Sequence, residues 1–148
     1  MFENAFKNLD VRKWFDRMHP QTLAIAIWLS YFDGVFAFLG LMDKQGEFGV
    51  MRYIGGVRVL LALAAISAYF VGPFLMANGK RLGWYLALAA SFSPLIIRFT
   101  SFYEGYGIYA SFTTRITGGD LFGFMFEAAL CALLLHNMTR SYARTWLR

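Results

Sequence analysis

Four long apolar stretches, separated by short polar turns, dominate the pattern of the chain. They run approximately over residues 22–41, 57–76, 82–102 and 121–138. A helix needs about 20 mostly apolar residues to cross the roughly 30 Å of hydrocarbon in a bilayer. The runs are continuous, whereas the strands of an outer-membrane barrel alternate. The pattern therefore predicts an all-α fold, a four-helix transmembrane bundle that forms a single integral membrane domain over residues 1–148.

Amphipathic segments flank the predicted bundle. Over residues 1–19, apolar side chains recur at helical spacing with cations between them, which predicts an amphipathic helix in the membrane interface before Pro20. After the fourth stretch, Met138, Tyr142 and Trp146 follow at steps of four among arginines. Anchoring at the interface and docking against a partner helix both explain these segments.

Composition supports the membrane class. Of 148 residues, 58% are hydrophobic and 16% are charged, and the mean hydropathy is +0.47. A soluble domain of this size leaves about 30% of its surface in water, and this chain has too few charges to cover it. The single cysteine, Cys131, excludes a disulfide scaffold.

Lysine and arginine residues set the expected orientation. Nine lie on one side of the predicted spans and three on the other, which by the positive-inside rule places both termini in the cytoplasm. We therefore expect a multi-pass membrane protein. The net charge of +5 is explained by attraction to anionic membrane lipids, so no nucleic-acid partner is expected.

Each predicted span also carries small residues at helical spacing. Helices in lipid associate through close backbone approach, which such residues permit. The residues expected to pack helices together are Ala26, Ser30, Gly34, Ala64, Ala68, Gly72, Gly83, Ala87, Ser91, Gly119 and Gly123.

One ionisable residue lies in each span: Asp33, Arg58, Arg98 and Glu127. An unpaired charge at the bilayer centre costs about 2.5–3.5 kcal/mol, so these side chains should face one another. At about 1.5 Å per residue all four lie in the outer half of the membrane. We expect Arg98 to pair with Glu127 or Asp33, beside a carbonyl freed by Pro94. The cluster is either a neutralised core that fixes helix register or the lining of a route for a proton, ion or lipid headgroup.

The two outer connections differ in character. Between the third and fourth stretches, aromatic residues recur at steps of three, namely Tyr103, Tyr106, Tyr109 and Phe112. They form either an aromatic belt at the headgroup level or a contact surface for a protein partner. Residues 43–47 have the composition of a solvated turn.

Enzyme signatures are absent from the sequence. It contains no zinc-protease motif, no Cys-x-x-Cys, no glycine-rich phosphate loop and no nucleophile elbow. His19 and His136 lie at the expected cytoplasmic boundary, and Cys131 is typical of a packing residue. We therefore expect no catalytic residue, metal or cofactor.

Two segments carry a resemblance. They are His19-Pro20-Gln21-Thr22-Leu23 leading to Tyr31-Phe32-Asp33, and Ala132-Leu133-Leu134-Leu135-His136 leading to Tyr142-Ala143-Arg144-Thr145-Trp146. The chain resembles small uncharacterised four-span membrane proteins of actinobacteria. The resemblance implies a bacterial plasma (inner) membrane and service to a larger envelope machine, for which a lipid importer of the mammalian-cell-entry type is a candidate.

Two functions remain open from the sequence. The first is a non-enzymatic accessory subunit that stabilises a plasma-membrane complex by packing against larger transmembrane partners. The second is a small homo-oligomeric transporter or channel that uses the buried Asp, Glu and Arg cluster.

Overall fold

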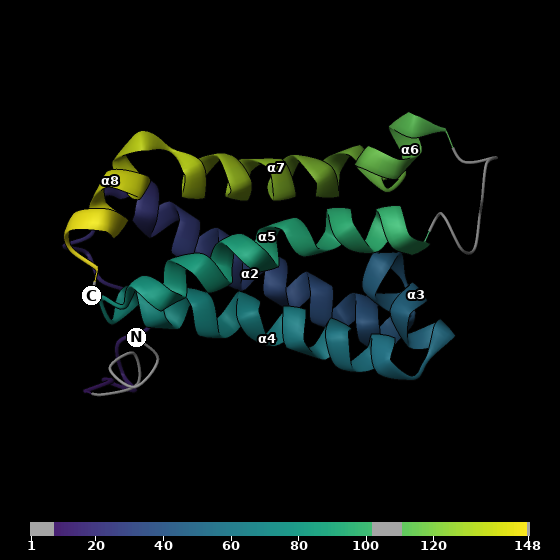
Figure 1. Cartoon of the computed structure of the whole chain (residues 1–148), viewed down its shortest axis with the longest axis horizontal. Helices are drawn as coiled ribbons and strands as arrows, with labels where there is room; N and C mark the ends of the chain where they lie inside the picture. The colour runs from purple at the N-terminus through teal and green to yellow at the C-terminus, as the bar shows by residue number, and fades with distance from the viewer. Residues whose placement is uncertain (1–7, 102–110, 148) are drawn as a thin grey trace.

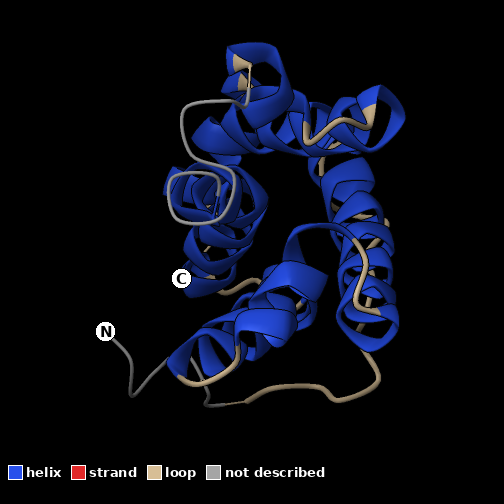
Figure 2. Cartoon of the chain, turned by 90° about the vertical axis from the view of Figure 1, so that its right-hand side faces the viewer, coloured by secondary structure: helices blue, strands red, loops and turns tan. Residues whose placement is uncertain are grey.

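The computed structural model describes residues 8–101 and 111–147, and every regular element within them is an α-helix. Helices and loops make up the whole of this part (Figure 2). Four helices run along the bundle and three shorter ones lie at its ends (Figure 1). Their bounds are α2 (Gln21–Asp43), α3 (Gly46–Ile54), α4 (Val57–Ala77), α5 (Arg81–Ser101), α6 (Phe112–Thr117), α7 (Leu121–Leu135) and α8 (Asn137–Thr145).

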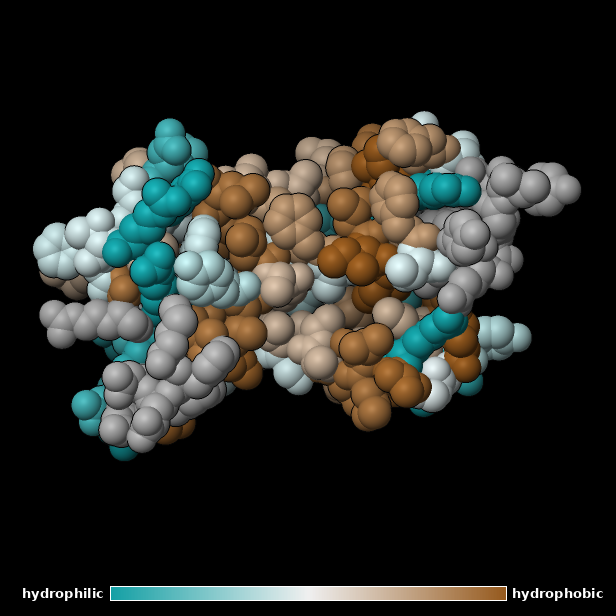
Figure 3. Space-filling model, viewed as in Figure 1, coloured by the Kyte–Doolittle hydropathy of each residue, from teal (hydrophilic) through white to brown (hydrophobic). Residues whose placement is uncertain are grey.

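Three of these helices, α2, α4 and α5, are long and apolar enough to cross a membrane. The pair α7 and α8 adds a fourth span if the two count as one bent crossing. On the face shown in Figure 3, apolar residues gather in the middle and hydrophilic residues at the two ends. The chain thus has the helices and the surface of a multi-pass membrane protein.

The α4–α5 hairpin is the tightest part of the bundle. A Cβ atom on Gly72 would lie 2.7 Å from the backbone nitrogen of Ala87, and one on Gly83 would lie 2.5 Å from the carbonyl oxygen of Gly72. These distances are shorter than real Cβ contacts, so both positions need glycine. The hairpin turns at Gly79, whose φ of +75° also suits glycine.

Helix α2 packs against α4 through its own small residues. A Cβ on Gly34 would lie 2.8 Å from the Cβ of Tyr69, and the Ser30 hydroxyl donates to the Tyr69 carbonyl oxygen at 3.2 Å. Ala26 is fully buried in the same row. Backbone polar groups and small side chains therefore hold α2 against α4.

Several residues expected to pack helices lie elsewhere. Ala64 is exposed and Ala68 is half-buried, because Ala62 and Tyr69 form the buried face of α4 instead. Gly119 lies in the turn before α7 with a φ of +83°. Gly123 is half-buried in the first turns of α7, next to Asp120 of its own chain segment. On α5, in contrast, Ala87 and Ser91 are buried.

Helix α3 occupies the region expected to be a solvated turn. Lys44 ends α2 in the left-handed conformation, and Gly49 of α3 lies directly against the Lys44 backbone. Arg52 donates hydrogen bonds to the carbonyl oxygens of Leu41 and Met42, at 3.1 and 2.9 Å. A cation at the carboxyl end of a helix satisfies orphan carbonyls and the helix dipole, so α3 caps α2.

The segment before α2 is not the expected amphipathic helix over its described part. Residues 8–19 form turns, and residues 1–7 lie outside the described residues. The carboxylates of Asp10 and Asp16 accept from the backbone N–H groups of Arg12 and Met18, each two residues ahead. Such bonds compete with helical ones, which explains why the apolar spacing does not produce a helix here.

The fourth stretch breaks where a continuous span to residue 138 was expected. Helix α7 ends at Leu135, and α8 leaves it at an angle of 48°. His136 has an extended backbone, and its Nδ1 accepts from the Met138 N–H, so it caps α8. Thr139 of α8 donates to Thr22 of α2 at 3.0 Å, which fixes α8 beside the start of the first long helix.

Candidate functional site

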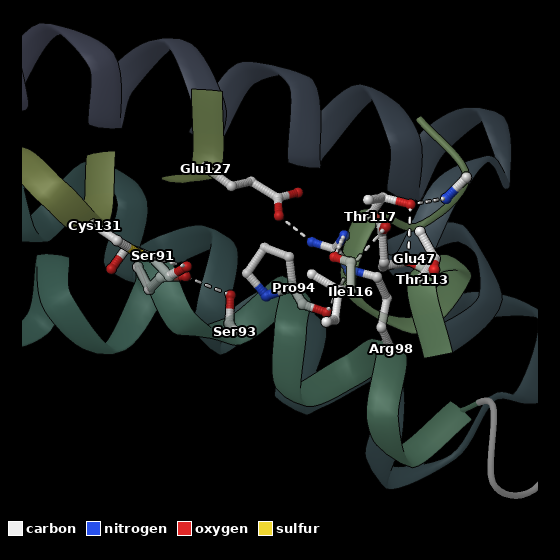
Figure 4. Close-up of polar contacts among 12 residues, drawn as sticks. Glu47, Ser91, Ser93, Pro94, Arg98, Thr113, Ile116, Thr117, Glu127 and Cys131 are labelled. Atoms are coloured by element: carbon white, nitrogen blue, oxygen red, sulfur yellow. Dashed lines mark hydrogen bonds and ion pairs between the residues drawn. The ribbon is translucent and has the colours of Figure 1, made fainter. Parts of the chain in front are cut away.

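The centre of the site is Arg98, in the last turn of α5, which is only 2% exposed. Its Nη2 forms an ion pair with Glu127 of α7, and its Nε lies 3.3 Å from Oε1 of Glu47 in α3. Figure 4 shows both acids directed at the guanidinium. We call these three residues the arginine junction.

Backbone carbonyls complete the surroundings of Arg98. Its Nη1 donates to the carbonyl oxygen of Ile116 in α6 at 2.6 Å, and its Nε donates to that of Pro94 at 3.3 Å. A guanidinium offers five donors and no acceptor, so carbonyls and carboxylates suit it equally. One side chain therefore joins α3, α5, α6 and α7.

Pro94 has the local effect expected from the sequence. Proline has no N–H to offer the carbonyl of Ala90 four residues earlier. The hydroxyl of Ser93 donates to this carbonyl at 2.7 Å. The backbone beside the arginine junction is thus satisfied by a neighbouring side chain, as membrane helices require.

A cavity of about 510 Å³ lies beside the arginine junction, at the end of the bundle that holds α3 and α6. Aromatic rings and carboxylates line it, and no lysine or arginine is among its described lining residues. The acidic members are Asp33, Asp43, Glu47, Asp120 and Glu127. The aromatic members are Phe32, Phe36, Phe48, Tyr69, Phe122, Phe124 and Phe126.

Asp33 of α2 differs from the other acids in the cavity wall. Its Oδ2 is buried and has no hydrogen-bond partner within residues 8–101 and 111–147. Glu47 and Glu127, in contrast, both engage Arg98. A buried carboxylate without a partner is unfavourable unless a proton or a cation accompanies it.

The charges around the cavity do not balance. Glu47 and Glu127 share the buried cation Arg98, whereas the buried Oδ2 of Asp33, on the same cavity wall, has no hydrogen-bond partner among the described residues. With Asp33, Glu47, Glu127 and Arg98 all ionised, these four groups together carry two excess negative charges. The site is therefore suited to bind positive charge.

The structure brings together only part of the predicted polar cluster. Arg98 and Glu127 form an ion pair, and Asp33 lines the same cavity as Glu127. Arg58 lies in the first turn of α4 and is not among the described lining residues. Glu47 belongs to the site although the sequence suggested a solvated turn.

The other candidate residues are spread over the molecule. Tyr103, Tyr106 and Tyr109 lie outside the described residues, and Phe112, the first residue of α6, is 69% exposed. Cys131 is half-buried, with its Sγ 3.6 Å from the carbonyl oxygen of Ser91.

The described chain offers no group of three or more His, Cys, Asp or Glu residues that could hold a metal ion. His19 instead lies against Tyr142, with Nδ1 3.1 Å from the hydroxyl, and His136 caps α8. The acids of the cavity are therefore better suited to a cation without strict coordination.

Comparison of the chain with protein-family models, with curated proteins and with solved structures finds no match. The functional argument therefore rests on the geometry and charge of the site.

Proposed function

We propose that the chain is a small membrane transport protein that binds a cationic solute in the cavity beside the arginine junction. One observation carries the proposal: the buried Oδ2 of Asp33 has no partner in the described chain, on the wall of a cavity without lysine or arginine. Arg98 cannot supply the missing charge, because Glu47 and Glu127 already engage it.

The lining favours an organic cation over a metal ion. Ca²⁺ requires six to eight oxygen ligands and Mg²⁺ an octahedral set, whereas the described acids form no such group. Ammonium groups are attracted to aromatic rings, and Phe32, Phe36 and Phe126 are among the residues that line the cavity. A volume of about 510 Å³ falls within the range of small-molecule sites.

The opposite end of the bundle explains how solute access is limited. There, Leu23 and Ile27 of α2 and Leu130 and Leu134 of α7 are all buried. A solute in the cavity thus meets a packed layer that must open before it can cross. In the orientation proposed from the charge distribution, with both termini in the cytoplasm, the cavity belongs to the outer half of the membrane.

Binding tests the proposal most directly. The full chain in detergent should bind benzyltrimethylammonium and not benzenesulfonate, an anion of similar size. Asp33→Asn should weaken binding of the cation on the order of tenfold or more, because it removes the charge without changing the shape. Asp10→Asn, an exposed acid at the opposite end of the bundle, is the matched control and should change affinity little. Equal affinities for wild type and Asp33→Asn would overturn the proposal.

A measurement of solute uptake distinguishes a transport function from a purely structural role of the charged residues. In vesicles containing the full chain, Asp33→Asn and Glu127→Gln should both abolish uptake of benzyltrimethylammonium. Because Glu127→Gln also breaks the ion pair with Arg98, its uptake must be expressed per correctly folded protein. Unchanged uptake per folded protein, with lowered abundance, would support a cluster that only fixes helix register.

A second candidate, an accessory subunit of a larger membrane complex, is favoured by the packing of α7. Of its 15 residues only Leu130 and Leu134 are buried, while Phe122 and Met125 are 70% and 61% exposed. This apolar face is available to lipid or to another transmembrane chain. Under this alternative, gentle extraction should recover heterologous subunits in fixed ratio, and recovery of a pure monomer would contradict it.

A further inference from the structure

The end of the bundle opposite the cavity is strongly basic. Within its described segments, residues 8–20, 78–84 and 136–147, seven cations accompany only the two acids Asp10 and Asp16. The cations are Arg12, Lys13, Arg17, Lys80, Arg81, Arg140 and Arg144. One acid is committed locally, since Asp16 lies 2.7 Å from Lys13. This end therefore carries an excess of positive charge toward its surroundings.

Helix α8 presents part of this charge on a fixed face. The inward face of α8 contains Thr139 and Ala143, and Leu147 follows just after the helix; all three are at most 5% exposed. Arg140 and Arg144 are both exposed, and they are four residues apart, which places them on one outward face. Neither arginine forms an ion pair within residues 8–101 and 111–147.

Exposed apolar side chains lie at the same end of the bundle as these arginines. Met138 of α8 is 54% exposed, Trp146 just after α8 is 69% exposed, and Met18 of the segment before α2 is 86% exposed. In α8 a basic face is thus combined with exposed tryptophan and methionine, a pattern typical of helices in the headgroup region. The 48° bend from α7 turns α8 away from the direction of the span.

Contacts with the bundle hold α8 in this position. Tyr142 contacts His19 through its hydroxyl, at 3.1 Å from Nδ1, and its ring packs edge-on against the imidazole. Thr139 is hydrogen-bonded to Thr22. The arginines therefore project from a helix that is already fixed, so binding to their outward face requires little additional ordering.

We propose that the Arg140 and Arg144 face of α8 binds the headgroups of anionic phospholipids. The phosphate of such a lipid meets two guanidinium groups, while Met138 and Trp146 contact the upper part of the acyl chains. The geometry is independent of the cavity at the other end of the bundle, so this proposal stands or falls separately from the transport function.

Lipid competition on the full chain tests this site. The protein is placed in nanodiscs with equal amounts of phosphatidylglycerol and phosphatidylcholine, and the lipids retained after release are counted by native mass spectrometry. Wild type should retain phosphatidylglycerol preferentially. Arg140→Gln/Arg144→Gln should reduce that preference on the order of tenfold, because each cation near an anionic surface contributes about 1 kcal/mol.

Two controls make the result specific. Arg140→Lys/Arg144→Lys keeps the charge and should keep most of the preference. Lys44→Gln removes a cation at the opposite end and should leave it unchanged. An equal loss for Lys44→Gln, or no loss for the double glutamine variant, would overturn the proposal. The proposal would also be overturned if the double glutamine variant kept its lipid preference but lost an acidic protein that copurifies with wild type.

Discussion

At the scale of single residues, the depth of a charged residue in its predicted span is enough to predict part of the arginine junction. Arg98 and Glu127 were expected at similar depth, and they form an ion pair. Glu47 was not expected there, because it follows Asp43 and Lys44 in a polar segment that is typical of a turn. Only the way α3 folds back brings Glu47 to 3.3 Å from Arg98, and that depends on tertiary packing. The amphipathic pattern of Phe48 and Met51 was the available signal.

Removing Arg98 should be costly, because it leaves Glu47 and Glu127 without their cation. We expect Arg98→Met to lower the free energy of unfolding by about 3 kcal/mol, the loss typical of a broken buried ion pair. Lys44→Met, at an exposed position, should change it by less than about 0.5 kcal/mol. Denaturant unfolding in detergent, followed by circular dichroism, measures both. Similar values for the two variants would show that the junction does not stabilise the fold.

His19 predicts a pH dependence. Burial lowers the pKa of its imidazole below the ordinary value of 6.5. The fold therefore favours the neutral ring beside Tyr142, and its stabilising effect is complete above about pH 6.5 and is lost as the pH falls toward the lowered pKa. Asp16, whose pKa is lowered by the hydrogen bond with Lys13, titrates below this window.

The measurement is the midpoint of thermal unfolding between pH 7.5 and pH 5.5. Wild type should lose stability over this interval, and His19→Asn should lose less. His136→Asn is the matched control, since His136 is exposed and asparagine can also cap α8. If His136→Asn removes the pH dependence of unfolding and His19→Asn does not, the assignment of that pH dependence to His19 is wrong.

At the scale of elements, the long helices were predictable and the short ones were not. The predicted stretches 57–76 and 82–102 correspond to α4 and α5, because uninterrupted apolar runs of this length specify spans by composition alone. A helix as short as α3 or α6 depends on caps and packing rather than on its own propensity. Over residues 8–19 the apolar spacing favours a helix, but the hydrogen bonds from backbone N–H groups to Asp10 and Asp16 stabilise turns instead.

The α4–α5 hairpin gives a prediction at this scale. Gly83→Leu should destabilise the protein by about 1–3 kcal/mol or more, since a side chain there meets the backbone of α4 at Gly72. Ala64→Leu enlarges a small residue on the exposed face of α4, and it should be tolerated. Thermal unfolding of the two variants in one detergent distinguishes them. If Ala64→Leu is the more harmful change, the assignment of the packed face of α4 is wrong.

At the scale of the whole molecule, charge separates the two ends of the bundle. The end that contains α8 is basic, and the end that contains α3 has both acids and bases. The numbers of lysine and arginine residues in the loops already suggested this asymmetry. The structure adds that α8 contacts the start of α2. Which side of the membrane each end occupies follows only from the positive-inside rule, so it stays a prediction.

Labelling of cysteines on intact cells tests this orientation. In a Cys131→Ala background, Gln45→Cys lies in the α2–α3 turn and Ser141→Cys lies on the exposed side of α8. A membrane-impermeant maleimide should label Gln45→Cys on intact cells and Ser141→Cys only after permeabilisation. The reverse pattern would place both termini outside and would turn the cavity toward the cytoplasm.

The arginine junction also has a consequence for biosynthesis. Glu47 precedes Arg98 in the chain, whereas Glu127 follows it, so the nascent α3–α5 segment already contains one acid for its arginine when it leaves the ribosome. That early pairing lessens the penalty of transferring α5 from the translocon into lipid before α7 is made. Glu127 then provides the last contact, which makes docking of α7 the step that completes assembly.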